Sequence, residues 1–243
     1  MSEVQRIKSF LESLTYEEKR CSCLNWKNGQ NPFVTISRQA GAGGNTLANA
    51  ILEELGRHNE DPLFQRWQRF NEELCRRITE EPGLSVSLET LMKYEYRSQI
   101  EDMLDELIVG NSSQDLVSKK MFHLIRTLAT FGKVILVGRG GVCLTRDLPL
   151  GIHVRLVAPL KVRIKRVSDL FSLTEKKAKE LISEQDKGRA KLMKTFFNKN
   201  IDEPLLYDAI WNTDTVAIED IARSVASLIK SKTCHCAVEE ARK

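Results

Sequence analysis

The stretch FVTISRQAGAGGNT, residues 33–46, decides the fold that we predict for this chain. It opens with a short apolar and β-branched run, which is typical of a buried strand, and continues into a glycine-rich turn. The run that follows places Leu47, Ala50, Ile51 and Leu55 at helical spacing, and the glycine after it suits a helix C-cap. A strand, a glycine-rich turn and a helix in this order are the parts of a phosphate-binding loop.

The turn departs from the usual phosphate-loop pattern. Against G-x-x-x-x-G-K-[ST], Arg38 stands at the first glycine, Gly44 at the lysine and Asn45 at the Mg²⁺-binding hydroxyl. Gly41, Gly43 and Gly44 still permit positive φ, so successive N–H groups and the helix N-terminus would form an anion-binding concavity. The turn alone leaves three interpretations open: a nucleotide site that uses another cation, an inactive nucleotide site, or a turn that binds no ligand.

Further apolar runs extend this pattern along the chain. GKVILVG and HVRLVA suit buried strands, and DAIWNTD is a plausible last strand. Helical patterns separate or follow them, at about 63–131, 160–171, 174–193 and 218–229. Strands that alternate with helices predict a parallel sheet covered on both faces, with ligands beyond the carboxyl ends of its strands. We expect one α/β domain over 32–231, preceded by an arm and linker over 1–31 and followed by a tail over 232–243.

Composition excludes several classes of protein. Hydrophobic residues make up 42% of the 243 residues and charged residues 29%, which is ordinary for a globular protein. The net charge of +4 is too small to predict a nucleic-acid partner. No apolar run approaches the roughly 20 residues that span a bilayer, and the N-terminus lacks the apolar core of a secretory signal. We therefore expect a cytoplasmic protein with neither a nucleic-acid nor a membrane partner; the sequence does not predict its oligomeric state.

Six cysteines in such a chain do not predict a disulfide framework. Cys75 and Cys143 lie in apolar contexts and are expected in the core. The other four form two Cys-X-Cys pairs near the chain ends, which would make a soft, zinc-type site if the ends met. That spacing is tighter than the usual Cys-X2-Cys, so we expect free surface thiols at Cys21, Cys23, Cys234 and Cys236, with His235 between the last two.

Arginines mark two more candidate regions. Arg139 follows the strand VILVG at its carboxyl end, where a planar guanidinium suits either a phosphate or a structural ion pair. Arg163 and Arg166 share a helical face at i, i+3, as do Asp186 and Arg189. Taken alone, each of these two pairs is typical of a solvated face or an intrahelical salt bridge.

Six segments together resemble the cytidylate kinase-like family, P-loop proteins related to nucleoside monophosphate kinases. In order they are TISRQAGAGGNTLA, WQRFNEELCRRI, VILVGRGGVCLTRDLP, HVRLVAPL, QDKGRA and PLLYDAIWNTD, and they cover about residues 33–229. The resemblance implies a P-loop NTPase fold of the α/β class, with a parallel sheet flanked by helices. It also implies a helical monophosphate-binding region over about 63–131 and a mobile lid over about 160–195.

The resemblance suggests roles for the arginines. Arg139 in VGRGG matches the acceptor-phosphate arginine of DGRD in true cytidylate kinases, and Arg97 is a candidate second acceptor contact. Asp186 and Arg189 match the DxxR stretch that meets nucleotide near the lid. The other lid candidates are the two basic residues at its start, Arg163 and Arg166.

Two departures from DGRD weaken the inference to cytidine. Val137 and Gly140 stand where that pattern carries the two aspartates that help to select the cytidine nucleotide. The resemblance therefore implies a nucleotide kinase more firmly than it implies an acceptor.

The function that we predict is ATP-dependent phosphoryl transfer to a nucleoside monophosphate with a CMP-like acceptor, using ATP and Mg²⁺. Arg38 would supply the missing lysine's charge, Gly44 would leave space for it, and Arg189 would close with the lid over the transferring group. Mg²⁺ would be held by Thr46 directly or through water. The donor phosphates would lie on the backbone N–H groups of Gly41, Ala42, Gly43, Gly44, Asn45 and Thr46.

The sequence leaves two alternatives open. One is a catalytically weak or inactive nucleotide-binding module with a regulatory role. In this case the lysine and the carboxylates are missing because catalysis has been lost. The other is a small-molecule kinase with a non-cytidine acceptor.

Overall fold

A computed structural model describes residues 31–71, 73–75 and 113–240, together with Ser9. Five strands form one sheet in the order β2-β3-β1-β4-β5, and every neighbouring pair is parallel. This confirms the predicted parallel sheet. The strands are β1 (Phe33–Arg38), β2 (Gln68–Phe70), β3 (Val134–Val137), β4 (Gly151–Val157) and β5 (Ala209–Asn212).

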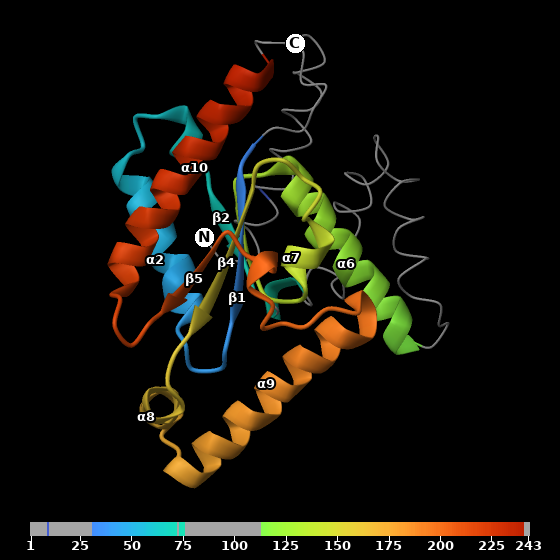
Figure 1. The fold of residues 1–243 in the computed structure, drawn as a ribbon, viewed down its shortest axis with the longest axis vertical. Helices are drawn as coiled ribbons and strands as arrows, with labels where there is room; N and C mark the ends of the chain where they lie inside the picture. Colours follow the sequence, from blue (N-terminus) through green and yellow to red (C-terminus); the bar gives the residue numbers. More distant parts are fainter. Residues whose placement is uncertain (1–8, 10–30, 72, 76–112, 241–243) are drawn as a thin grey trace.

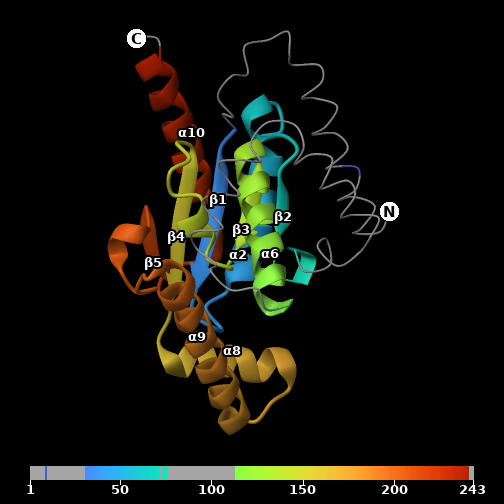
Figure 2. The ribbon, with the colours of Figure 1, turned by 90° about the vertical axis from the view of Figure 1, so that its right-hand side faces the viewer.

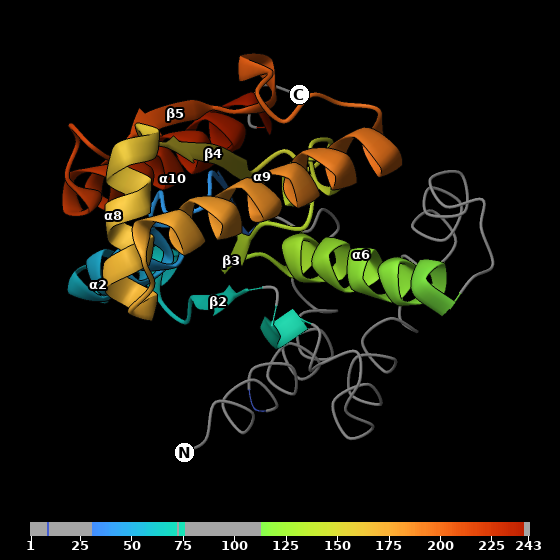
Figure 3. The ribbon, with the colours of Figure 1, turned by 90° about the horizontal axis from the view of Figure 1, so that it is seen from below.

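Helices cover both faces of the sheet and its carboxyl edge. Helices α2 and α10 lie on one face, and α6 and α7 lie on the other (Figure 1). Helices α8 and α9 form a hairpin beyond the end of the sheet where β1 runs into α2, as Figures 2 and 3 show from two further directions. Their bounds are α2 (Gly44–Arg57), α6 (Ser113–Phe131), α7 (Gly141–Leu144), α8 (Leu160–Phe171), α9 (Glu175–Phe197) and α10 (Ile218–Glu240).

Alternation along the central strands separates two hydrophobic clusters. Toward α2 and α10, the larger cluster contains Val34 and Ile36 of β1 with Ile152, Val154 and Leu156 of β4, all at most 1% exposed. Toward α6, the second cluster contains Phe33 and residues of β3 and α6. Strands buried on both faces are expected in a parallel sheet.

One predicted helical segment begins differently. Residues Pro62–Phe64 form a 3-10 turn, and β2 pairs with β3 at the edge of the sheet, where a helix was predicted from residue 63 onward. The indole Nε1 of Trp67 donates to the Leu63 carbonyl at 2.9 Å and holds the turn against the strand. A three-residue strand is too short to show a period of two, so this part of the prediction was wrong.

Two other boundaries differ from the sequence prediction, and one predicted region cannot be compared. Helix α2 continues through Gly56 to Arg57, so the C-cap is His58 and not the glycine. Helix α10 continues to Glu240, into the segment predicted as a tail. Residues 76–112, which include Arg97 and most of the predicted monophosphate-binding region, lie outside the described residues.

None of the helices in the described part of the chain is long and apolar enough to cross a membrane.

Candidate functional site

Three predicted arginines meet at the carboxyl edge of the sheet. A cavity of about 370 Å³ lies between the ends of β1 and β3 and helix α9, and it is lined by Arg38, Arg139 and Arg189. The hydroxyl-bearing residues Thr35 and Ser37 of β1 also line it. This is where ligands bind in open parallel α/β sheets. Its charged lining residues are all cationic, so the cavity suits an anion.

Arg38 occupies the space that a phosphate-loop lysine would use. A Cβ atom built on Gly44 would lie 2.9 Å from Cγ of Arg38 and 3.1 Å from its Cδ. A Cβ atom built on Gly138 would lie 1.9 Å from Nη1 of the same arginine. The Arg38 side chain therefore crosses Gly44 and ends against the residue that follows β3. Neither glycine could carry a side chain while Arg38 keeps this path.

The loop after β1 has the backbone conformation of an anion cradle. Gly41 and Gly43 have φ of 77° and 88°, in the left-handed region that glycine adopts without strain. Gly43 is the N-cap of α2 and supplies no side-chain hydrogen bond. Because the first N–H groups of a helix have no partner within the helix, those of α2 are suited to a phosphate.

Asn45 and Thr46 present exposed oxygen-bearing side chains on the first turn of α2. Oxygen ligands are what Mg²⁺ prefers, and in nucleotide sites it takes few of them from protein. Within the described ranges, no group of three or more His, Cys, Asp or Glu residues could hold a metal ion. The side chains of Asn45 and Thr46 fit a Mg²⁺ ion that takes most of its ligands from substrate phosphates and water.

Arg139 projects from three consecutive left-handed residues. Gly138, Arg139 and Gly140 have φ of 88°, 55° and 69°, and α7 begins directly after them. A non-glycine residue at positive φ costs free energy and is often retained at functional sites. A Cβ atom on Gly140 would lie 2.4 Å from Cε2 of Phe197, so the aspartate of DGRD would fit there only if Phe197 moved.

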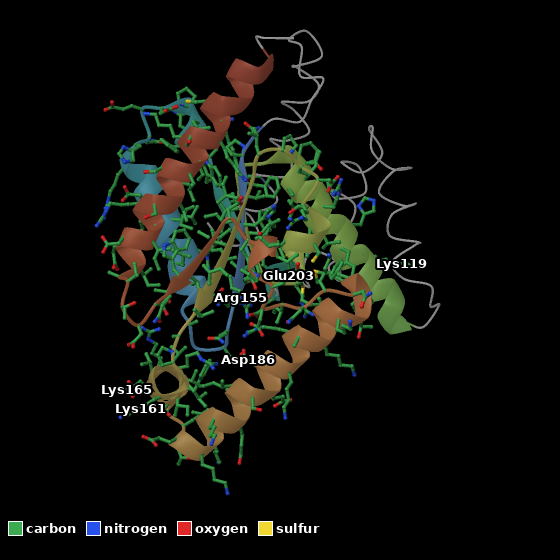
Figure 4. The ribbon with its side chains drawn as sticks, viewed as in Figure 1. Lys119, Arg155, Lys161, Lys165, Asp186 and Glu203 are labelled. Carbon is green, nitrogen blue, oxygen red and sulfur yellow. The ribbon has the colours of Figure 1, made fainter. Side chains whose placement is uncertain are left out.

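The predicted lid residues divide into two groups. Asp186 of α9 accepts from the backbone N–H of Ala40 at 2.7 Å and from Nη1 of Arg163 at 2.8 Å. Arg163 is buried and also donates to the carbonyls of Ala158 and Ala40. Figure 4 shows Asp186 between α9 and the loop that follows β1. The interpretation of Arg163 as part of a solvated face was therefore wrong, because the residue is buried and its hydrogen bonds join α8, α9 and the loop.

Arg166 and Arg189 complete this set. Arg166 donates to the hydroxyl and the carbonyl of Thr213 at 2.9 and 2.7 Å, which ties α8 to the segment after β5. Arg189 lies 3.4 Å from Asp186 in an ion pair within α9, as predicted for residues at i, i+3. Among these four lid residues, Arg189 alone lines the 370 Å³ cavity.

Sequence reasoning missed a polar row on the face of β1 and β4 opposite α2. Thr35 pairs in register with His153, and Ser37 with Arg155. The Thr35 hydroxyl lies 2.8 Å from Nδ1 of His153, and Nη1 of Arg155 donates to Oγ of Ser37 at 2.8 Å. The Tyr207 hydroxyl donates to the Ile201 carbonyl at 2.8 Å and lies 3.2 Å from Oγ of Ser37. The signal was present as polar residues at alternate positions of two strands that were predicted only as buried strands.

Burial shifts the pKa of three groups near this row. It lowers the pKa of His153 to about 4, against the attraction of Asp208, so the ring is neutral at pH 7. It raises the pKa of the Tyr207 phenol. It also raises the pKa of the half-buried Cys143 to about 11, although Lys199 and Arg146 lower it. Cys143 is thus a thiol at neutral pH and not a nucleophile.

Comparison with known proteins agrees with this geometry. A profile of the cytidylate kinase-like family matches residues 33–215. The chain belongs to the cytidylate kinase-like family. Proteins named cytidylate kinase in Methanocaldococcus jannaschii and Methanobrevibacter smithii are 23% and 27% identical to it. The matches cover 81% and 82% of this chain and 97% and 98% of theirs.

A crystal structure of an uncharacterized protein from Eubacterium ventriosum has a similar fold. It superposes with a TM-score of 0.62 at 18% sequence identity and covers 83% of this chain and 99% of that one. Family membership and the five-stranded parallel sheet confirm the predicted P-loop kinase fold. They also support a nucleotide kinase activity with small-molecule nucleotide substrates.

Proposed function

We propose that this protein transfers the γ-phosphoryl group of ATP to a nucleoside monophosphate with a CMP-like base. The observation that carries the proposal is the path of Arg38, which crosses Gly44 and brings a third cation to the cavity of Arg139 and Arg189. A phosphate loop that has lost its lysine keeps a positive charge beside the donor phosphates only if another cationic side chain enters the space of the lysine. Arg38 does so.

The donor phosphates would lie on the loop Gly41–Thr46, where left-handed glycines and the start of α2 present N–H groups. Phosphoryl transfer needs two substrates held in line and the charge of the moving group neutralised. Arg38 would neutralise charge on the donor side and Arg139 would hold the acceptor phosphate. Arg189, on the hairpin of α8 and α9, would close over the transferring group. Arg97 stays a predicted acceptor contact.

Mg²⁺, held at Asn45 or Thr46, would supply further positive charge to the donor phosphates. ATP and Mg²⁺ as the reagents, like a cytoplasmic location and the absence of a nucleic-acid partner, remain predictions from the sequence and the family.

The protein would recognise the acceptor base without using a carboxylate side chain. Phe197 and Leu192 fill the space beside Gly140 that an aspartate would need. The polar uncharged side chains that line the cavity are Thr35, Ser37 and Gln185. Hydroxyl and amide groups both donate and accept, so they distinguish pyrimidines less sharply than a carboxylate does. We expect CMP to be used, with UMP used at a comparable rate.

The first experiment measures ADP release. Purified protein is incubated with ATP and Mg²⁺ against CMP, UMP, dCMP, AMP and GMP, with a control that lacks acceptor. ADP above the control with pyrimidine monophosphates is the expected result. If no acceptor in the panel raises ADP above the control, nucleoside monophosphate kinase activity is refuted.

The second experiment exchanges the two cations. We expect Arg38→Ala to lower kcat by roughly 10²- to 10³-fold, as for removal of one donor to developing charge. The double variant Arg38→Gly, Gly44→Lys restores the first glycine and the lysine of the usual loop and removes the overlap at Gly44, so it should regain part of that loss. Arg223→Ala, on exposed Arg223 of α10, is the matched control. Unchanged turnover in Arg38→Ala would end the proposed role of Arg38.

A regulatory module that binds ATP without transfer is the second candidate. The observation that favours it is the loss of lysine at Gly44, together with the engagement of the Ala40 N–H by Asp186. Calorimetry that finds ATP binding, combined with no ADP from any acceptor in the panel, would favour this candidate.

A further inference from the structure

We infer that Arg155 is an additional phosphate-binding residue. In the absence of ligand its guanidinium pairs with the carboxylate of Asp202, and a polyphosphate that enters the cavity replaces this carboxylate. The inference rests on the proposed function in one respect, because it takes the polyphosphate to be the triphosphate of ATP. The feature behind it is a second cavity of about 240 Å³ that adjoins the first, since both are lined by Arg38, Arg189 and Ile201. Four basic residues line this second cavity: Arg38, Arg155, Lys187 and Arg189.

Arg155 is a buried charge whose position is already fixed. Its side chain is 3% exposed, it projects from β4, and Figure 4 shows it at the sheet. Nη1 donates to Oγ of Ser37 at 2.8 Å, and the guanidinium lies 5.7 Å from the centre of the Tyr207 ring. An arginine held in this way loses little freedom when it binds an anion, so it is preorganised for phosphate.

The carboxylate that faces Arg155 is held much less firmly. Nη2 of Arg155 donates to Oδ1 of Asp202 at 2.6 Å, but the Asp202 side chain is 68% exposed. Asp202 lies in a turn between α9 and β5. A buried charge without a partner is costly, whereas an exposed carboxylate that leaves its partner is rehydrated at once. Asp202 therefore satisfies Arg155 and can be displaced at low cost.

The other acidic residue of the cavity is not exchangeable in this way. Asp186 accepts hydrogen bonds from the Ala40 N–H and from buried Arg163, so it joins the hairpin of α8 and α9 to the loop after β1. Four basic side chains and two carboxylates line this cavity, so the formal charge of its lining is positive. A triphosphate supplies several charges to Arg38, Arg155 and Arg189 together, and so replaces Asp202 with a stronger anion.

The chain contains a matched pair for comparison. Arg126 and Asp147 form an ion pair in which the arginine side chain is 13% exposed and the aspartate side chain 65%. Arg126 also donates to the Leu144 carbonyl, and neither residue lines the two cavities described here. Asp147→Asn therefore makes the same change in net charge as Asp202→Asn, away from the cavity.

The test uses tripolyphosphate, a base-free probe, titrated calorimetrically into the full-length protein. We expect Asp202→Asn to tighten its binding by roughly two- to fivefold, the equivalent of one exposed ion pair. Arg155→Gln should weaken binding by roughly tenfold, as expected for a lost hydrogen bond to a charged group. Asp147→Asn should leave the affinity within about twofold of wild type.

Several results would overturn the inference. These are unchanged or weaker binding in Asp202→Asn, equal tightening in Asp147→Asn, or no binding of tripolyphosphate by the wild-type protein. Asp202→Asn alters an exposed side chain and keeps an oxygen that can accept from Arg155, so it gives an answer even if Arg155→Gln does not fold. The ADP assay is independent of this titration: a protein that gives the expected affinities but releases no ADP retains the site and lacks the proposed activity.

Discussion

The two faces of β1 and β4 are built from adjacent residues and have opposite characters. Toward α2 and α10, the residues are Val34, Ile36, Ile152, Val154 and Leu156, all but excluded from solvent. On the other face, in the same strands, the polar residues are Thr35, Ser37, His153 and Arg155.

A parallel sheet covered by helices is expected to be apolar on both faces. Burial of a polar group costs free energy unless a hydrogen bond replaces its water, and this polar row is hydrogen-bonded within itself. Thr35 and Ser37 also line the cavity of the arginines. One face of the central strands therefore stabilises the fold, while the other gives up apolar contact in order to line a site. The comparison predicts that substitutions on the first face alter stability, whereas those on the second alter function or the dependence of stability on pH.

The largest effect is expected on the apolar face. Ile152 is fully buried in the cluster between the sheet, α2 and α10. Ile152→Ala should lower the free energy of unfolding by about 2–5 kcal/mol, because it removes buried methyl groups and leaves a cavity. Urea unfolding followed by tryptophan fluorescence measures the change.

Leu170→Ala, at a side chain that is 74% exposed on α8, is the control and should change stability by less than about 0.5 kcal/mol. If kcat per folded molecule fell in Ile152→Ala as well, the separation of the two faces would be incomplete.

On the site side, Arg139→Ala should affect catalysis rather than stability. Arg139 lines the cavity from a left-handed position between two glycines. Its loss should lower kcat/KM for the nucleoside monophosphate by roughly 10²- to 10³-fold, while the free energy of unfolding changes by less than about 1 kcal/mol. Steady-state kinetics and urea unfolding give the two numbers. A fall in stability with unchanged kcat/KM would make Arg139 a structural residue.

The polar face also predicts a dependence of stability on pH. Burial lowers the pKa of His153 from 6.5 to about 4, with Asp208 opposing the shift and Lys232 and Arg146 adding to it. The unfolded chain therefore takes up a proton at this residue below pH 6.5 while the folded protein does not. As the pH falls through this window, stability is lost, by up to about 3 kcal/mol at pH 4.

His153→Gln removes this titration, so its unfolding free energy should fall less over the same window than that of the wild type. The measurement is urea unfolding at several pH values, with His58→Gln, at the exposed C-cap of α2, as the control. Equal slopes for the wild type and His153→Gln would contradict the assignment.

Much of the fold could be predicted because its signals are local. Apolar runs fixed four of the five strands, and helical spacing predicted α2, α6, α8, α9 and α10. The glycine-rich turn after β1 and the strand that ends before Arg139 placed the site at the carboxyl edge. The space that Gly44 leaves for Arg38 could also be predicted, since a lost lysine calls for another cation nearby.

The rest depends on contacts between distant residues. That Gly138 must lack a side chain follows from the path of Arg38, which starts in another strand. That Arg163 is buried follows from its bond to Asp186, which is 23 residues away. The pairing of Ser37 with Arg155 follows from strand order, which no single segment reveals. Local patterns identified the elements, whereas tertiary contacts decided which polar residues face each other.

The smallest expected effect separates helix propensity from space in the cavity. Gly188 of α9 and Gly56 of α2 are both helical, and a Cβ atom at either would meet no atom within 4 Å. Alanine at each should therefore raise the free energy of unfolding by about 0.5–1 kcal/mol. Gly188, however, lines the cavity of the arginines.

We expect Gly188→Ala to raise the KM for the acceptor by a factor of about five. This corresponds to about 1 kcal/mol of lost contact between the acceptor and α9. Gly56→Ala should leave KM unchanged. Thermal unfolding and initial-rate kinetics on the two variants give the comparison. If both variants gained stability and neither changed KM, Gly188 would not be keeping space for a ligand, and the acceptor would bind nearer to β1 than to α9.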